Sequence, residues 1–93
     1  MDARLNVARI LGLEDGDAHV IRNAGAIVTD DVLRSLEASR SLGTEQVVLM
    51  LHTDCGAREG DLEAAAREAA AQIEGPVRAL VYDVDSRELR EVS

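Results

Sequence analysis

The chain has 93 residues, of which 18 are Asp or Glu and 10 are Lys or Arg, so its formal net charge at pH 7 is −8. This length suffices for one domain, and we expect residues 1–93 to form it. The acidic balance argues against a nucleic-acid or anionic-membrane surface, because neutralising phosphates requires a basic patch. The sequence contains no apolar run of about 18 residues, the length of a membrane span. Its first residues lack the basic and apolar blocks of a signal peptide.

The cysteine content limits the possible disulfide chemistry and indicates the cellular compartment. Cys55 is the sole cysteine, so it cannot form an internal disulfide and is either a buried thiol or a working one. A chain without disulfides suits a reducing compartment, and we predict a cytoplasmic location. Tyr82 is the sole aromatic residue, so the core must be built from Val, Leu, Ile and Ala.

The first predicted elements are short. Asn6–Leu11 favours a helix that ends at Gly12, and residues 14–17 are typical of a turn. Residues 19–21, His-Val-Ile, include two β-branched apolar side chains and predict a buried strand. This strand leads into the polar segment Arg-Asn-Ala-Gly at residues 22–25.

A helix and a strand are predicted next. Thr29 is a typical N-cap, and Asp30 and Asp31 would lie in the first turn, where the helix dipole favours carboxylates. Gly43 would end this helix. Residues 46–51 are almost entirely apolar, which indicates a strand covered on both faces, as in a parallel sheet.

The remaining elements complete an alternating pattern. Asp61 would cap a second long helix, which Gly75 and Pro76 end. Val77–Val84 is the next predicted strand, and after a turn at residues 85–86 the segment Leu89–Val92 would return as an antiparallel edge strand. The order predicts an α/β fold: a small, largely parallel sheet with flanking helices and a C-terminal antiparallel edge strand.

Ligands of open parallel sheets gather beyond the carboxyl ends of the strands. His52 and Cys55 follow the predicted strand 46–51 at a three-residue spacing. Imidazole nitrogen and thiolate sulfur are both good zinc ligands, so this pair is a candidate metal site. The alternative is a hydrogen-bonded histidine beside a small buried thiol, and the spacing alone favours that alternative.

Asp2 and Arg4 form a second candidate. Two residues apart in an extended segment, their side chains would leave on the same face, where the arginine fork could hold the carboxylate ionised. Such a carboxylate could bind a metal or accept a hydrogen bond from a metal-bound hydroxide. The alternative is a solvated pair on a frayed terminus.

Three polar residues of the segment 19–25 have simpler interpretations. His19 has no partner at ligand spacing, and we interpret it as structural. Arg22 and Asn23 could order a loop through hydrogen bonds to backbone carbonyls, and a role in a pocket stays open for both.

Four motifs in this order strongly resemble the β-class carbonic anhydrases, particularly their compact bacterial branch. They are Met1–Leu5, His19–Gly25, Val28–Val32 and His52–Gly56. Residues 82–84 resemble the C-terminal hairpin of the same family, so the resemblance covers nearly the whole chain.

The family is zinc-dependent and interconverts carbon dioxide and bicarbonate. The resemblance implies that His52 and Cys55 bind Zn²⁺, one ion per chain. It implies that Asp2 and Arg4 form the catalytic dyad, in which Asp2 orients the zinc-bound hydroxide or binds zinc itself in a closed state.

The resemblance also places Ala24 and Gly56 at the border of the carbon dioxide pocket, and it implies a homodimer or a higher homo-oligomer, since the family commonly dimerises.

The sequence also departs from the family pattern. In the family a zinc-binding cysteine on a central strand directly precedes the Met-Asp-x-Arg motif, whereas this sequence starts at Met1. We therefore expect a β-carbonic-anhydrase-like fold that lacks its first central strand, with the connection from Gly56 to Val77 reduced to one helix. Asp2 could serve as the third zinc ligand. The alternative function is a metal-free, non-catalytic domain that survives through association.

Overall fold

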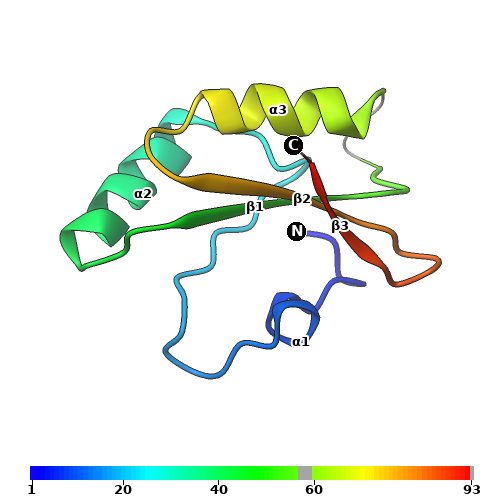
Figure 1. Ribbon diagram of the computed structural model, residues 1–93, viewed down its shortest axis with the longest axis horizontal. Coiled ribbons are helices and arrows are strands. Elements are labelled where there is room, and N and C mark those ends of the chain that lie inside the picture. The colour runs from blue at the N-terminus through cyan, green and yellow to red at the C-terminus, as the bar shows by residue number, and fades with distance from the viewer. Residues whose placement is uncertain (57–59, 93) are drawn as a thin grey trace.

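A three-stranded mixed sheet organises the chain, whose computed structural model describes residues 1–56 and 60–92 (Figure 1). Strands β1 and β2 are parallel, and β3 pairs with β2 in the antiparallel direction. Helix α3 lies over one face of the sheet, whereas α1 lies beyond the opposite face. In chain order the elements are α1 (Val7–Leu11), α2 (Asp30–Ser41), β1 (Val47–His52), α3 (Leu62–Ala71), β2 (Val77–Tyr82) and β3 (Leu89–Val92).

The register of the sheet fixes where the functional residues lie. Val47 pairs with Val77 and His52 pairs with Tyr82, so β1 and β2 end at the same edge. Strand β2 ends two residues earlier than predicted, because Asp83 begins the turn to β3. Its carboxylate accepts hydrogen bonds from the backbone N–H groups of residues 85 and 86, and these bonds lower its pKa. The predicted antiparallel edge strand is confirmed.

The predicted N-caps Thr29 and Asp61 are confirmed, because each side chain accepts a hydrogen bond from a backbone N–H in the first turn of α2 and α3. Asn6 was expected within the first helix and is instead the N-cap of α1, where its side chain accepts from the Arg9 N–H. Gly12 ends α1 with φ at 69°, a left-handed conformation that favours glycine. No helix in the described part of the chain has the length and apolar character needed to cross a membrane.

One predicted strand is wrong. Residues 19–21 form no strand, although their side chains favour one. A strand exists only where a neighbouring strand completes its backbone hydrogen bonds, and in the described part of the chain β1 pairs with no strand besides β2. The prediction that β1 is covered on both faces is also wrong, because Val48 is 43% exposed.

The core lies between the sheet and α3. Leu51, Ala79 and Val81 project from one face of β1 and β2 onto Ala66 of α3, and all four are buried. Alanines along α3 leave no bulk between helix and sheet, so the helix approaches closely. This packed layer fixes the end of β1, where the candidate site begins.

We predict that Leu51→Ala lowers the free energy of unfolding by about 2–5 kcal/mol, because it leaves a cavity beneath α3. Leu51 is 2% exposed, whereas Leu42 is 78% exposed, so Leu42→Ala is the matched control and should change stability by about 0.5 kcal/mol at most. Urea unfolding followed by circular dichroism measures both. Equal losses in the two variants would contradict this placement of the core.

Candidate active site

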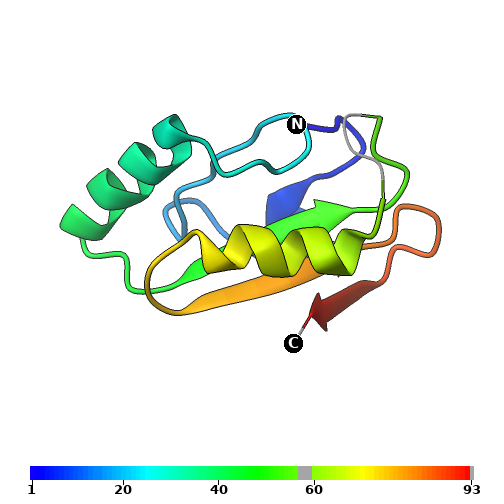
Figure 2. The same ribbon diagram turned by 90° about the horizontal axis from the view of Figure 1, so that it is seen from above.

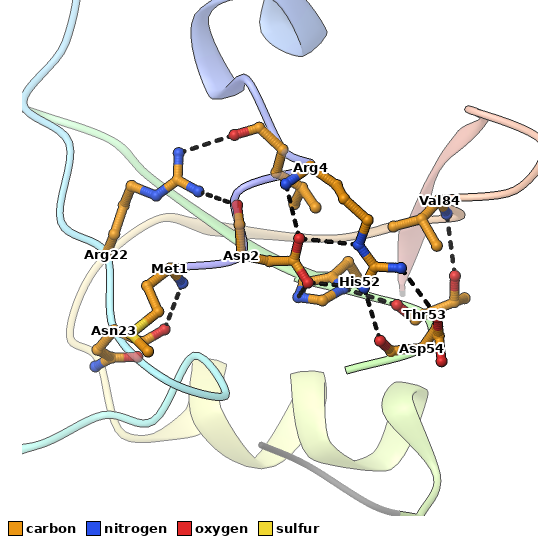
Figure 3. A network of polar contacts seen from close by, with 10 residues as sticks. Met1, Asp2, Arg4, Arg22, Asn23, His52, Thr53, Asp54 and Val84 are labelled. Carbon is orange, nitrogen blue, oxygen red and sulfur yellow. Dashed lines mark hydrogen bonds and ion pairs between the residues drawn. The ribbon is translucent and has the colours of Figure 1, made fainter. Parts of the chain in front are cut away.

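The N-terminal residues lie against the carboxyl end of β1 (Figure 3). Residues 2–5 form a turn in which the Leu5 N–H donates to the Asp2 carbonyl over 3.2 Å. The expectation of an extended segment is therefore wrong. The turn nevertheless brings the side chains of Asp2 and Arg4 together, because the backbone N–H of Arg4 points at the Asp2 carboxylate and donates to it.

Arg4 holds the carboxylate of Asp2 with three hydrogen bonds. Its Nε and Nη2 atoms donate to Oδ1 and Oδ2 over 3.0 and 2.7 Å, and its backbone N–H donates to Oδ1 over 2.8 Å. This is the bidentate fork that guanidinium and carboxylate planes favour. The sequence-based prediction of a paired Asp2 and Arg4 is confirmed.

The same guanidinium reaches the loop after β1. Arg4 Nη1 donates to Asp54 Oδ2 over 2.9 Å, and Nη2 donates to the Asp54 carbonyl over 2.8 Å. Asp54 has a φ of 51°, a left-handed conformation that Asp tolerates better than most residues. Sequence reasoning missed Asp54, because the contact spans 50 residues and no local spacing indicates it.

These contacts set the charges of the pair. Hydrogen bonds from the Arg4 side chain, and then from its backbone N–H, hold the pKa of Asp2 well below its usual range. The hydrogen bonds to Asp2, and then to Asp54, raise the pKa of Arg4 above its usual value. The carboxylate is therefore ionised at neutral pH and acts as an acceptor.

His52 is the last residue of β1, and its ring is held in one orientation. Nδ1 lies 2.7 Å from the Thr53 carbonyl oxygen. A carbonyl only accepts, so Nδ1 carries the proton, and in the neutral ring Nε2 is left with a lone pair. Nε2 lies 3.8 Å from Asp2 Oδ2. A backbone carbonyl that fixes the ring in this way is typical of metal-binding histidines.

Thr53 is itself fixed at this edge of the sheet. Its N–H donates to the Tyr82 carbonyl over 2.9 Å, and its hydroxyl accepts from the Val84 N–H over 3.0 Å. The parallel pairing of β1 and β2 therefore continues one step beyond His52 and positions the carbonyl that orients the ring.

Cys55 lines the same cavity as Asp2 and His52, a space of about 830 Å³ between the N-terminal half of the chain and β1. Nitrogen, sulfur and oxygen donors of these types suit zinc. Within residues 1–56 and 60–92, however, no three His, Cys, Asp or Glu side chains lie together as a group that could hold a metal ion. The donor types fit zinc, but the described residues do not form a complete site.

Arg22 and Asn23 hold the N-terminal turn in place. Arg22 donates from Nη1 to the Leu5 carbonyl over 2.9 Å and from Nη2 to the Asp2 carbonyl over 2.6 Å. The Asn23 side-chain amide donates to the Ile27 carbonyl over 2.8 Å, and its backbone carbonyl accepts from the N-terminal ammonium of Met1 over 2.7 Å. The prediction that these residues order a loop through backbone carbonyls is confirmed, and both also line the cavity.

The other sequence-predicted residues lie apart from this cluster. Ala24 and Gly56 are exposed and do not line the cavity, so their place at a carbon dioxide pocket stays a prediction. His19 Nδ1 lies 2.6 Å from the Ser39 hydroxyl, which donates onward to Thr44, in agreement with a structural role.

We predict that Asp2 titrates below its ordinary pKa of 3.8 in metal-free folded protein, and that Arg4→Gln returns the pKa towards that value. Because folding lowers this pKa, the pair stabilises the fold at pH values above 3.8, and the contribution is lost as the pH falls towards the folded-state pKa. Carbon-13 NMR of the carboxyl carbon measures the titration, with Arg34→Gln as the control. An unshifted Asp2 in the original chain would contradict the pairing.

We predict that Arg22→Ala destabilises the chain by about 1.5–3 kcal/mol, because two carbonyls lose a charged donor. Arg34→Ala removes an exposed pair with Asp31 and should cost at most about 1 kcal/mol. Urea unfolding compares the two variants. Equal small losses would show that Arg22 does not hold the turn.

Comparison with known proteins places the chain among the carbonic anhydrases. The sequence profile of the carbonic anhydrase family matches residues 1–91. Beta-carbonic anhydrase 1 of Mycobacterium tuberculosis H37Rv is 65% identical over 57 residues, which are 60% of this chain and 35% of that protein. A carbon disulfide hydrolase of Acidianus is 46% identical over 57 residues, which are 60% of this chain and 28% of that protein. The chain thus spans well under half the length of these curated relatives.

Solved structures agree with the sequence matches. The carbonic anhydrase of Streptococcus mutans superposes with a TM-score of 0.94 and 37% identity over 100% of this chain and 77% of its own. The carbonic anhydrase of Glaciozyma antarctica superposes with a TM-score of 0.89 and 29% identity, over 100% of this chain and 78% of its own. The family match over residues 1–91, together with the beta-carbonic anhydrase relatives, shows that this chain belongs to the β-carbonic anhydrase family.

Proposed function

We propose that this chain catalyses the reversible hydration of carbon dioxide to bicarbonate, with zinc bound by His52 and Cys55. The observation that carries the proposal is the position of the Asp2 carboxylate, 3.8 Å from the Nε2 atom of His52 and held there by Arg4. An ionised acceptor beside a metal-binding nitrogen is what activation of a water molecule requires.

The free lone pairs of Asp2 define its role. Oδ1 accepts from both the backbone and the side chain of Arg4, which uses its two acceptor sites. Among the described residues, only Arg4 Nη2 donates to Oδ2, which therefore keeps one acceptor site, and Oδ2 is the oxygen that faces His52. In the proposed reaction Oδ2 accepts a hydrogen bond from the attacking water and orients it, while Arg4 keeps the carboxylate ionised and fixed.

Zinc would lower the pKa of a bound water molecule to about 7, so that hydroxide is available near neutral pH. His52 Nε2 is the donor best prepared for it, since Nδ1 is committed to the Thr53 carbonyl. Cys55 would add a thiolate from the following loop. Asp2 could serve as a third ligand through Oδ2, but it would then no longer orient the water.

Carbon disulfide is the second candidate substrate. Relatives described as carbon disulfide hydrolases match this chain at 46% identity over 57 residues and 47% over 57 residues. Carbon disulfide, like carbon dioxide, is a small linear electrophile that water attacks at carbon. Its hydrolysis releases hydrogen sulfide, which distinguishes the two activities directly.

A non-catalytic role is the rival proposal. Several large apolar side chains are exposed, among them Val20, Ile21, Ile27 and Val48. Such a surface favours association, so a metal-free homodimer or higher homo-oligomer of this fold is the alternative to an enzyme. For either function we propose a cytoplasmic location, which the absence of any cysteine besides Cys55 supports.

We predict that the zinc-loaded chain accelerates carbon dioxide hydration and that Asp2→Asn lowers kcat/KM at least about 100-fold, because an amide does not accept the same hydrogen bond. Asp31→Asn is the matched control, since Asp31 forms a similar 2.7 Å pair with Arg34 on the exposed face of α2. Stopped-flow measurements with a pH indicator follow the rate, and sulfide release from carbon disulfide is followed in parallel.

Metal analysis completes the test. Zinc content near one ion per chain that is lost in both His52→Ala and Cys55→Ser supports the enzyme. Two results together would support the non-catalytic role and contradict the catalytic proposal. They are a metal-free dimer in light scattering and equal hydration rates in the original chain and in His52→Ala.

A further inference from the structure

Asp54 has an unusual position among the residues near Asp2. It lies in the loop after β1, between the proposed zinc ligands His52 and Cys55, and its φ of 51° is in the left-handed region. Few residues with a side chain adopt that region, and Asp is one of them. The Asp54 side chain is 76% exposed, yet it is bonded to Arg4. An uncommon backbone angle beside a site is a reason to look for a function.

The contact between Asp54 and Arg4 joins two separate segments. Figure 2 shows the N-terminal turn and the loop after β1 side by side at the carboxyl end of β1. Arg4 Nη1 donates to Asp54 Oδ2 over 2.9 Å, and Nη2 donates to the Asp54 carbonyl over 2.8 Å. Two bonds from different nitrogens of one planar group restrict its rotation. Asp54 therefore fixes the plane of the guanidinium relative to β1.

The plane of the guanidinium determines where the second oxygen of Asp2 points. Oδ1 is already held within the turn, because the backbone N–H of Arg4 donates to it over 2.8 Å. Oδ2 accepts from Nη2 over 2.7 Å, and Nη2 is also the atom that donates to the Asp54 carbonyl. A fork keeps guanidinium and carboxylate close to one plane, so turning the guanidinium turns the carboxylate with it. Oδ2 would then leave its place 3.8 Å from His52 Nε2.

Arg22 holds a different part of Asp2. Its two Nη atoms donate to the backbone carbonyls of Leu5 and Asp2, so it fixes the backbone of the turn. A side chain can still change its rotamer when its own backbone is fixed. The direction of the Asp2 carboxylate therefore depends on Arg4, and through Arg4 on Asp54.

We propose that Asp54 is a positioning residue, which holds Arg4 and thereby directs Oδ2 of Asp2 to its place beside His52 Nε2. The catalytic consequence rests on the proposed hydration activity, whereas the direction of the Asp2 side chain does not. An exposed ion pair contributes little to stability. Its effect on a reaction is larger, because a misplacement of about 1 Å in a catalytic group can lower a rate about 100-fold.

Two substitutions separate the side chain of Asp54 from its backbone. Asp54→Gly removes the acceptor and tolerates the φ of 51°. Asp54→Asn keeps an oxygen acceptor at the same distance from the backbone and tolerates the same angle. Asp54→Ala, which also lacks the acceptor, takes the place of the glycine variant if that variant does not fold. Arg87→Gly is the matched control, since Arg87 has a φ of 62° in the turn between β2 and β3.

NMR of the metal-free protein measures the placement directly. Nuclear Overhauser contacts between the β-protons of Asp2 and the ring protons of His52 show whether the carboxylate lies beside the ring. We expect these contacts in the original chain, in Asp54→Asn and in Arg87→Gly. We expect their loss in Asp54→Gly, because the guanidinium is then free to turn.

Kinetics of the zinc-loaded chain measure the consequence for the reaction. Asp54→Gly should lower kcat/KM for carbon dioxide hydration about tenfold, whereas Asp54→Asn should stay within about threefold of the original chain. A double-mutant cycle tests the route. Because Asp54 acts through Arg4, adding Asp54→Gly to Arg4→Gln should lower kcat/KM no further.

Three results would overturn the proposal. They are contacts between Asp2 and His52 that survive Asp54→Gly, contacts that are absent from the original chain, and a loss of rate from Asp54→Gly that persists in the Arg4→Gln background. A zinc-loaded original chain that does not hydrate carbon dioxide would contradict the proposed function instead, and the NMR comparison would still decide whether Asp54 directs Asp2.

Discussion

The guanidinium of Arg4 is the contact on which the arrangement of the site depends. It bonds to Asp2 within its own turn and to Asp54 beyond β1, so it joins the N-terminus to the end of the sheet. This link and the hydrogen bond from Arg22 to the Asp2 carbonyl together hold Asp2 beside His52. A partly exposed ion pair contributes little to stability in most proteins, but here its geometric effect matters more than its energy, because one planar group fixes two carboxylates.

The sheet supplies the other half of the site. The parallel pairing of β1 with β2 continues to Thr53, whose carbonyl orients the His52 ring and whose hydroxyl is bonded to the turn after β2. The register between β1 and β2 therefore determines both the packing of the core beneath α3 and the orientation of the His52 ring at the edge of the sheet. Within the described residues, the edge of β1 opposite β2 pairs with no strand. The sheet is accordingly paired on one side of β1 and unpaired on the other.

Local sequence signals predicted much of this structure. The caps Thr29 and Asp61 act over three residues or fewer, and α2 and α3 begin where these caps predict. Asn6 was expected as the first residue of α1 and caps that helix instead. The Asp2–Arg4 pair was predictable for the same reason, although the backbone there is a turn. The strand expected at residues 19–21 failed because a strand depends on a neighbour, and β-branched residues alone do not provide one.

Contacts between residues far apart in the sequence were harder to predict. Asp54, which meets Arg4 across 50 residues, was missed. Arg22 was correctly expected to bond backbone carbonyls, although nothing in the sequence indicated which ones. Such contacts follow from the folded path of the chain, since neither residue has a spacing or a neighbour that marks it. The zinc ligands were proposed from residue type and family resemblance. The described residues include a His52 ring held by the Thr53 carbonyl, but no group of three side chains that could hold a metal ion.

Proton NMR of the arginine side chains tests most directly whether Arg4 is held between Asp2 and Asp54. We expect the Nη protons of Arg4 to give separate, slowly exchanging signals at neutral pH, because rotation about the guanidinium bonds is blocked. Arg9 has no side-chain partner in the described part of the chain and serves as the internal reference. Arg4 signals that are averaged like those of Arg9 would contradict the account.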